Sequence, residues 1–469
     1  MTNQPALTWD RRAARRGGLD KHLIIASTHT GTYNLPSCPT ITGRRSVVLF
    51  ESEAMAKAAG FRPCRVCKPD QFHGQGGGSL VTFKKLVDAM SADPVEISSL
   101  EAAAAVCDMS IEKLRILLAD HAQMTPESWL DRQRVAFAAQ RLISGCSADS
   151  SVGVETGFPN VADYERTFTR HMALAPGEYR KALRSTHFRL RLPTGYRSKD
   201  VLAYQGRDPD GLAERVSGRH IYKALSTPDG PAILHLELAT EHTIVMIQSD
   251  RTLSEASVAG LHVSALKILG LFSDIGPFEA AHPDLVAGHR GLHVPLIPNA
   301  FDALCWAIVG QQINITFARS LRRYLIDVAG TPVGAMKTHP SPEAIADLNP
   351  STLRANRFSR SKVEYLQHAG EAVASGRVNI ENLWKGSAVE AESKLMGLHG
   401  VGTWTARYVL MRIGFGDAAP VGDSGLSTAL QRFNELPNRP DAVEVARLMT
   451  RYAPWRSLAS VHLWASLEH

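Results

Sequence analysis

The sequence predicts a multidomain protein that is mainly α-helical with α+β parts. Its 469 residues exceed what a single hydrophobic core supports, so we expect three or four domains. Helical periodicity dominates from about residue 80 to residue 183 and again from residue 299 onward. Strand-like runs lie between these stretches, at Phe188–Leu192, Ala232–Leu238 and Thr243–Ile247, and predict a small sheet.

The composition favours a globular protein over a membrane protein. Hydrophobic residues make up 44% of the chain, and the formal charge of +6 mildly favours an anionic partner. No apolar run approaches the roughly 20 residues of a membrane helix, and the N-terminus, MTNQPALTWDRRAARR, lacks the apolar core of a signal peptide. We therefore expect a cytoplasmic protein with no membrane partner. Its six cysteines should be reduced, so clustered ones indicate metal binding or chemistry.

A front module, residues 1–73, precedes a glycine-rich joint at Gly74–Ser79. Cys64 and Cys67 have the spacing of a metal knuckle, and Cys38 lies upstream in Pro-Ser-Cys-Pro. Two thiolates two residues apart can hold one zinc ion from a single turn. Three buried thiols without metal are the alternative.

The motifs TGTYNLPSCPT, GRR and AAGFRPCRVCKPD resemble the N-terminal domain of the Ada family. The resemblance implies a domain in which four cysteines bind zinc and the first accepts a methyl group from a DNA methylphosphotriester. Asn34 stands at the position of that first cysteine. Arg44 and Arg45 match the family's basic segment and are expected to contact phosphates, with a solvated surface as the alternative.

The substitution at position 34 changes the expected chemistry. A carboxamide is a poor nucleophile and a weak zinc ligand compared with a thiolate, so we predict that phosphotriester repair is lost. Zinc remains the expected cofactor, with Asn34, His29 or water in the fourth position; a metal-poor DNA-binding fold is the alternative. The expected metal ligands are Cys38, Cys64 and Cys67.

A weak internal duplication fills residues 80–184. The order helix, turn, helix and proline-containing stop occurs in SLEAAAAVCDMSIEKLRILLADHAQMTPESWL and again in SSVGVETGFPNVADYERTFTRHMALAPGEYRKAL. The second stretch resembles the AraC-type DNA-binding domain, with GF before the recognition helix and PGEYR after it. The two candidate recognition helices, about Ser110–His121 and Asn160–His171, would lie in the major groove of double-stranded DNA. A plain helical bundle is the alternative.

Few side chains on these two helices suit the reading of bases, so DNA binding is expected to be weak or mostly through phosphates. On the first helix they are Glu112, Lys113 and Arg115, and on the second Asn160, Arg166 and Arg170.

A Gly-Val-Gly turn lies between two helical patterns near the C-terminus. Gly400 and Gly402 free the backbone so that its N–H groups can approach a phosphate oxygen. The helix that follows from Thr403 adds the dipole of its N-terminus. Leu398 and Val401 are expected to pack inward and hold the two helices together. On its own such a turn is weak evidence, because many helical turns need glycine.

Asp423 follows in Val-Gly-Asp-Ser-Gly-Leu, a loop that enters a helix. The residues alone leave two interpretations: a simple N-cap, which aspartate performs well, or a carboxylate that stabilises positive charge on a sugar while its bond to a base breaks.

From about Phe188 to the C-terminus the chain resembles the AlkA class of DNA glycosylases in the helix-hairpin-helix superfamily. The resemblance rests on HVPLIPNAFDALCWAIVGQQINITFA, the hairpin, the Asp423 segment and RYAPWRSLASVHLW. It implies an α+β domain at residues 187–295 and a glycosylase domain at 296–469. It also implies a catalytic role for Asp423 and hydrolytic release of alkylated bases of the 3-methyladenine and 7-methylguanine type.

The same resemblance implies base flipping and a pocket for the flipped base. Gln312 matches the wedge position, and Trp404, Tyr408 and Trp464 match pocket or near-pocket positions. Taken singly, each aromatic residue is more typical of a core. Trp404 stands where strand-nicking relatives carry a lysine, so we expect a monofunctional enzyme without lyase activity. No cofactor is expected for the glycosylase reaction.

Two other functions remain open. The chain can be a transcriptional regulator of the alkylation response with a secondary glycosylase half, or a glycosylase for deaminated bases. The sequence does not identify a protein partner.

Overall fold

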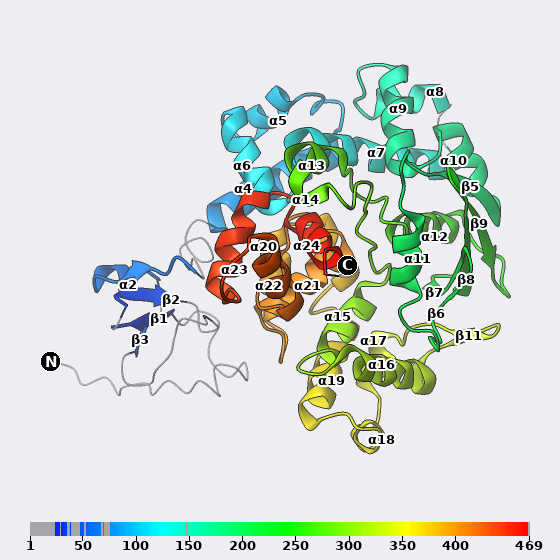
Figure 1. The fold of residues 1–469 in the computed structure, drawn as a ribbon. Helices are drawn as coiled ribbons and strands as arrows, with labels where there is room; N and C mark the ends of the chain where they lie inside the picture. The colour runs from blue at the N-terminus through cyan, green and yellow to red at the C-terminus, as the bar shows by residue number, and fades with distance from the viewer. Residues whose placement is uncertain are drawn as a thin grey trace.

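The computed structural model describes residues 24–28, 30–34, 38, 47–50, 53–66, 69, 76–145 and 149–467. It confirms the predicted multidomain architecture, mainly helical with small sheets (Figure 1). A small sheet module, a helical module, a five-stranded sheet and a C-terminal helical region follow one another along the chain. Within these described ranges, no helix is long and apolar enough to span a membrane.

The N-terminal module contains a four-stranded sheet in the order β3-β1-β2-β4, which lies at one side of the molecule in Figure 1. Helix α2 (Glu53–Ala58) packs against it, and Ile24, Tyr33 and Ala56 form its small core. The strands are β1 (Ile24–Ser27), β2 (Thr32–Asn34), β3 (Val47–Phe50) and β4 (Arg62–Pro63).

Both segments expected to be recognition helices are helical in the structure. Helix α6 begins directly after its N-cap Ser110, and α9 begins directly after its N-cap Asn160. The joint expected at Gly74–Ser79 is wrong in part, because helix α4 begins at Gly76. Its first turns make contacts, with the Thr82 hydroxyl donating to the Gly78 carbonyl at 2.9 Å. The helices are α4 (Gly76–Ala92), α5 (Leu100–Val106), α6 (Ile111–His121), α7 (Pro126–Ser144), α8 (Asp149–Glu155), α9 (Val161–Met172) and α10 (Pro176–Ala182).

A five-stranded antiparallel sheet in the order β5-β9-β8-β7-β6 follows. The three expected strands are present as β5, β8 and β9, whereas β6 and β7 were not predicted. Leu234 and Val245 of this sheet share one hydrophobic core with Phe168 and Tyr179 of the helical module. The elements are β5 (His187–Arg191), α11 (Ser198–Gln205), β6 (Glu214–Ser217), β7 (His220–Thr227), β8 (Gly230–Leu238), β9 (His242–Gln248) and α12 (Glu255–Ile268).

The C-terminal helical region is built around α15, in which every residue is buried. Helices α16, α19 and α21 pack against it, so the helix after the hairpin rests on the centre of this core. The elements are α13 (Gly276–Ala281), α14 (Pro283–Val286), α15 (Ala300–Val309), α16 (Ile315–Ala329), β10 (Pro332–Val333), β11 (Met336–Lys337), α17 (Pro342–Ala346), α18 (Pro350–Ala355), α19 (Arg360–Ala374), η2 (Ile380–Lys385), α20 (Ala388–Met396), α21 (Thr403–Ile413), α22 (Ser424–Phe433), α23 (Ala442–Met449), η3 (Thr450–Tyr452) and α24 (Arg456–Ala465).

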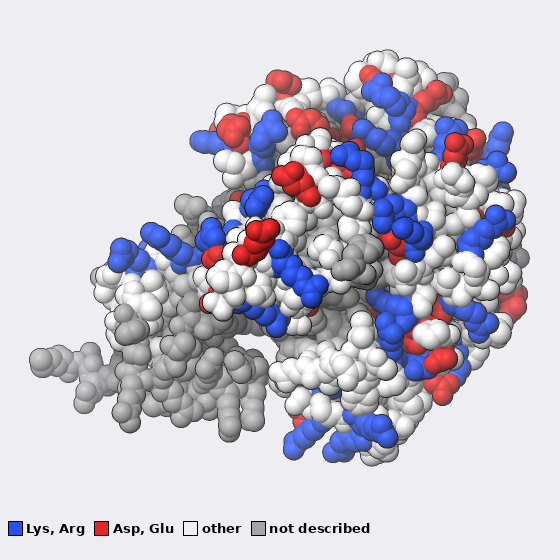
Figure 2. Space-filling model, in the orientation of Figure 1, with Lys and Arg blue, Asp and Glu red and all other residues white. Residues whose placement is uncertain are grey.

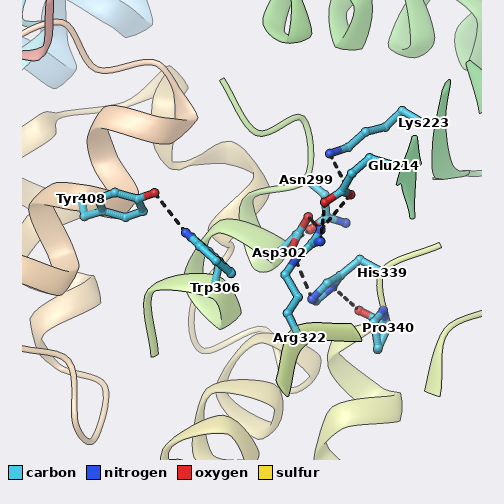
Figure 3. Close-up of polar contacts among 9 residues, drawn as sticks. All are labelled: Glu214, Lys223, Asn299, Asp302, Trp306, Arg322, His339, Pro340 and Tyr408. Atoms are coloured by element: carbon cyan, nitrogen blue, oxygen red, sulfur yellow. Dashed lines mark hydrogen bonds and ion pairs between the residues drawn. The ribbon is translucent and has the colours of Figure 1, made fainter. Parts of the chain in front are cut away.

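A buried ion cluster joins the sheet to this helical region (Figure 3). Arg322 of α16 donates to Glu214 of β6 at 2.5 and 3.1 Å and to Asp302 of α15 at 2.8 and 3.0 Å. Lys223 of β7 completes the cluster, 3.3 Å from Glu214. Burial raises the pKa of Glu214, but Arg322 and Lys223 more than offset this and hold it at about 2. Two cations therefore balance two carboxylates, as a buried cluster requires.

Candidate catalytic and nucleic-acid site

Asp423 is the N-cap of α22, as the aspartate-then-helix pattern predicted. Its Oδ1 accepts hydrogen bonds from the backbone N–H of Leu426 at 2.8 Å and from the indole Nε1–H of Trp464 at 3.1 Å. Within the part of the chain that the structure describes, both bonds end on Oδ1 and none on Oδ2. One oxygen is thus fixed in place while the other remains available to a ligand.

The hairpin between α20 and α21 depends on its first glycine. Gly400 has a φ of +82°, and a Cβ placed there would lie 2.3 Å from the ring of Tyr365. Leu398 and Val401 are buried, which confirms their predicted inward packing. Gly402 is exposed, and a Cβ at this position would meet open space.

The N-terminus of α21 has no side-chain cap, unlike those of α20 and α22, which precede and follow it. Its N-cap is Gly402, which has no side chain to accept from the first N–H groups at Thr403 and beyond. Such free N–H groups, with the helix dipole behind them, suit an external anion. Other helices of the region carry a side-chain cap at Asn299, Asn314, Ser341, Asn349, Ser359, Ser387, Asp423 and Asp441.

The predicted wedge loop is attached to the hairpin. Gln312 is exposed and has a φ of +57°. Its neighbour Gln311 donates from Nε2 to the Gly400 carbonyl at 2.9 Å and to the Thr405 hydroxyl at 3.1 Å. Lys362 in turn donates to the Gln311 carbonyl at 2.6 Å. The loop and the hairpin therefore hold a fixed relative position.

The three aromatic residues expected in a pocket lie in one cluster. Trp404 stacks on Tyr408 with ring centroids 5.5 Å apart. The Arg412 guanidinium lies 5.4 Å from the Tyr408 ring and 5.8 Å from the Trp464 ring. The hydrogen bond from Trp464 to Asp423 links this cluster to the carboxylate.

The sequence interpretation missed four members of this cluster: Tyr204, Arg207, Trp306 and Arg412. Trp306 donates from Nε1 to the Tyr408 hydroxyl at 3.1 Å (Figure 3). Arg207 lies 4.3 Å from the Tyr204 ring and 5.0 Å from the Trp306 ring. Arg412 had a signal, because it follows Trp404 and Tyr408 at steps of four on one helical face.

Positive charge surrounds the phenol of Tyr204. Burial raises the pKa of Tyr204, but Arg207 and Arg412 together outweigh it and lower the value. Arg412 lies 4.7 Å from this ring. The cluster thus combines flat aromatic faces with fixed cationic groups, next to a carboxylate.

Two of the predicted metal ligands are adjacent in the N-terminal module. The Sγ atoms of buried Cys38 and Cys64 lie 3.9 Å apart. Two thiolates on one tetrahedral zinc ion would lie about 3.8 Å apart, given Zn–S bonds of about 2.3 Å. Among the described residues no group of three or more potential ligands gathers. Cys67, His29, Arg44 and Arg45 lie outside the described residues.

Asn34 has become part of the sheet beside this pair. Its side chain is buried, and its Nδ2 donates to the carbonyls of Thr32 at 3.0 Å and Ile25 at 3.3 Å. These bonds use the amide as a structural group of β2.

The predicted DNA-contacting arginines of α9 make intramolecular ion pairs. Arg166 contacts Asp163 at 2.5 Å, and Arg170 contacts Asp131 at 2.6 Å. Both arginine side chains remain at least half exposed, so they still face solvent. Figure 2 shows Lys and Arg interspersed with Asp and Glu on the visible face rather than gathered in one basic stripe.

A groove of about 640 Å³ lies elsewhere, lined by residues 183–186 after α10, by Ile233 and Ile247 of strands β8 and β9, and by the start of α12. None of the site residues described above lines it, so it contributes nothing to this site.

Family models match three parts of the chain. Residues 8–70 match the metal binding domain of Ada, and residues 103–182 match a helix-turn-helix domain. Residues 305–454 match the HhH-GPD superfamily of base excision DNA repair proteins.

Individual proteins are also similar to this chain, over part of its length or almost all of it. A DNA-3-methyladenine glycosylase of Bacillus subtilis is 35% identical over 208 residues, which are 42% of this chain and 69% of the relative. A protein of Mycobacterium tuberculosis named as a probable bifunctional transcriptional activator/DNA repair enzyme AlkA is 26% identical over 96% of this chain and 94% of its own length. The solved 3-methyladenine DNA-glycosylase of Archaeoglobus fulgidus shares the fold at a TM-score of 0.53, with 19% identity over 59% of this chain and 97% of that one.

Proposed function

The chain belongs to the DNA-3-methyladenine glycosylase family, and from that premise we propose that it hydrolyses the N-glycosidic bond of alkylated bases in double-stranded DNA. Bases of the 3-methyladenine and 7-methylguanine type are the substrates. Their ring already carries positive charge, so they leave more easily than normal bases.

The observation that carries this proposal is the state of Asp423. Breaking the N-glycosidic bond builds positive charge on the sugar, and a fixed carboxylate stabilises that charge. Oδ1 is held by Leu426 and Trp464, which leaves Oδ2 for the sugar cation and for the water that attacks it. Asp423 can therefore cap α22 through Oδ1 and act in catalysis through Oδ2.

The surrounding elements supply the steps before bond cleavage. The uncapped N-terminus of α21 binds a phosphate, and Gln312 enters the gap left when the damaged base leaves the stack. Trp404, Tyr408 and Trp464 then receive the base by stacking.

Strand cleavage is not part of the proposed activity. A lyase reaction needs an amine nucleophile that forms a Schiff base with the sugar. Position 404 holds a tryptophan whose ring stacks on Tyr408, so the hairpin offers no amine there. The product is an abasic site.

We propose that the front module, residues 1–73, binds zinc through Cys38, Cys64 and Cys67. The 3.9 Å separation of the first two thiols supports it, because it matches one edge of a zinc–thiolate tetrahedron. When bound, the ion would hold the module together and keep the thiolates deprotonated. Asn34 contributes no nucleophile, so transfer of a phosphotriester methyl group does not occur.

We also propose the four-part division at residues 1–73, 80–184, 187–295 and 296–469. The helix-turn-helix module binds duplex DNA mainly through phosphates. Binding to chromosomal DNA places the protein in the bacterial cytoplasm, at the nucleoid.

Control of transcription is the second candidate function. It is favoured by the Mycobacterium tuberculosis relative, which spans almost the whole chain and whose name joins a transcriptional activator to a repair enzyme. The two functions are compatible, because the helix-turn-helix and glycosylase parts occupy different segments.

Release of bases from methylated duplex DNA tests the proposed function. We expect wild type to release 3-methyladenine and 7-methylguanine without nicking the strand. Asp423→Asn should lower the rate by about 100-fold or more while DNA affinity stays close to wild type.

The matched control is Asp441→Asn, because Asp441 caps α23 in the same way, accepting from Glu444 at 2.9 Å. Asparagine serves as an N-cap about as well as aspartate. A variant at 423 with full activity, or an equal loss at 441, would refute the catalytic assignment.

A further inference from the structure

The helix-turn-helix module contacts the first helix of the hairpin. Figure 1 shows α4 and α6 beside the C-terminal helices, and α6 packs on α20. Nδ1 of His121, the last residue of α6, lies 2.7 Å from the hydroxyl of Ser387. Ser387 is also the N-cap of α20, accepting from Glu390 at 3.2 Å. Lys84 of α4 pairs with Glu390 at 3.1 Å.

The turn that follows α6 reaches a second segment of the glycosylase. Gln123, which has a φ of +54°, accepts a hydrogen bond at Oε1 from the backbone N–H of Asp417 at 2.8 Å. The two backbones are close, since a Cβ on Gly416 would lie 3.0 Å from the Gln123 carbonyl oxygen. This turn is therefore seated against the loop between α21 and α22.

Asp417 connects that turn to the catalytic segment by two routes. Its carboxylate accepts from the Arg456 side chain at 2.6 and 2.8 Å and from the Arg456 backbone N–H at 3.1 Å, which fixes the start of α24. Helix α24 carries Trp464, whose indole binds Asp423. Asp417 also precedes Asp423 by six residues in the same loop.

A third contact holds the two parts together. Arg132 of α7 lies against two contacting rings of the glycosylase part, 4.3 Å from Phe272 and 4.9 Å from Trp384. Burial lowers the pKa of Arg132 to about 10. A half-buried cation held against two aromatic rings is a specific contact, because the charge is stabilised only where the rings lie.

We propose that the helix-turn-helix module is a positioning element of the glycosylase, in which Gln123 fixes the segment that carries Asp423. The inference rests on the proposed function of Asp423. Removing the amide acceptor would leave the Asp417 N–H without its partner and release the loop and the start of α24. A shift of about 1 Å in a catalytic group can lower the rate constant of the chemical step by roughly 100-fold.

Single-turnover kinetics on a duplex with one 7-methylguanine separates positioning from binding. We expect Gln123→Met to lower the rate constant of base release by about three- to tenfold with unchanged Kd for the duplex. Gln123→Glu keeps an acceptor and should retain most of the rate. Gln140→Met, the same change at an exposed site on α7, should match wild type.

Gln123→Gly is a second test. It removes the amide acceptor without straining the backbone, because glycine readily adopts the positive φ of this position. Its rate constant of base release should fall by the same factor as in Gln123→Met, while its thermal midpoint stays near that of wild type. A wild-type rate in Gln123→Gly, or a loss confined to Kd, would overturn the positioning role. Absence of base release by the wild-type chain would instead overturn the proposed function itself.

Discussion

At the scale of single residues, the two hairpin glycines have different duties. Gly400 needs both its positive φ and the absence of a Cβ, because Tyr365 occupies that space. Gly402 has a φ of −96° and open space around it. The fold therefore requires glycine at the first position, whereas it places no steric demand on the second.

Alanine at each position separates these duties. Gly400→Ala should lower the free energy of unfolding by about 1–3 kcal/mol, from backbone strain and displacement of Tyr365. Gly402→Ala should leave stability unchanged but weaken DNA binding, because its methyl group projects toward the approaching phosphate. Chemical denaturation and fluorescence anisotropy with duplex DNA measure the two quantities. Equal stability losses in both variants would contradict this division.

Asp423 shows what residue types alone can decide. Its place before a helix was predictable, and so was its capping duty. The residues did not distinguish cap from catalyst, because that depends on Trp464, which lies 41 residues later and meets it only in the fold.

At the scale of elements, local patterns predicted the helical stretches and the starts of a few named helices. Helices α6 and α9 begin next to the polar caps that the sequence displays, Ser110 and Asn160. Strand β7 was missed for a physical reason. It carries Lys223, a charge typical of a surface, and that lysine is buried only because Glu214 pairs with it. The pairing partner is not visible in the local pattern.

The aromatic cluster follows the same rule. Trp404 and Tyr408 lie on one helix, and the resemblance to known glycosylases pointed to both. Tyr204 and Arg207 come from about 200 residues earlier, in and just after α11, and nothing in their local sequence indicates their partners.

The cysteines of the N-terminal module, Cys38, Cys64 and Cys67, lead us to predict that the protein contains zinc. Purified protein should carry about one zinc ion per chain, and Cys64→Ser should lose most of it, because a hydroxyl is a far poorer zinc ligand than a thiolate. Cys107→Ser removes a buried thiol of the helical module and is the control. Inductively coupled plasma mass spectrometry gives the stoichiometry.

A labelled DNA methylphosphotriester should transfer no methyl group to the wild-type protein, since Asn34 is engaged with the carbonyls of β1 and β2. Methyl transfer to the chain, or equal zinc content in Cys64→Ser, would show that the module works differently.

At the scale of the whole molecule, three buried histidines and the half-buried His171 make stability depend on pH. Burial lowers the pKa of His121, His171 and His262 to about 4 and that of His462 to about 3. These folded-state values lie below the unfolded value near 6.5. Unfolded chains therefore bind more protons between about pH 6.5 and pH 4. Stability is full above that range and is lost as the pH falls through it.

We expect the thermal midpoint to fall from pH 7 to pH 5, with each such histidine contributing up to about 1.4 kcal/mol per pH unit below 6.5. His262→Gln is the informative variant, because glutamine can still donate to the Met172 carbonyl, which His262 contacts at 2.8 Å, but does not titrate. Its midpoint should fall less over the same range. Identical pH profiles for the two proteins would exclude this source of acid sensitivity.

The buried cluster around Arg322 also limits how this protein can be divided or recombined. Its two cations, Arg322 and Lys223, lie on α16 and β7, and its two carboxylates come from β6 and α15. A cut between the sheet and the C-terminal helices would separate charges that were neutralised together. A functional recombinant therefore needs the sheet and the C-terminal helices from the same parent, because a crossover between β6 and α15 would otherwise pair Arg322 with unmatched carboxylates.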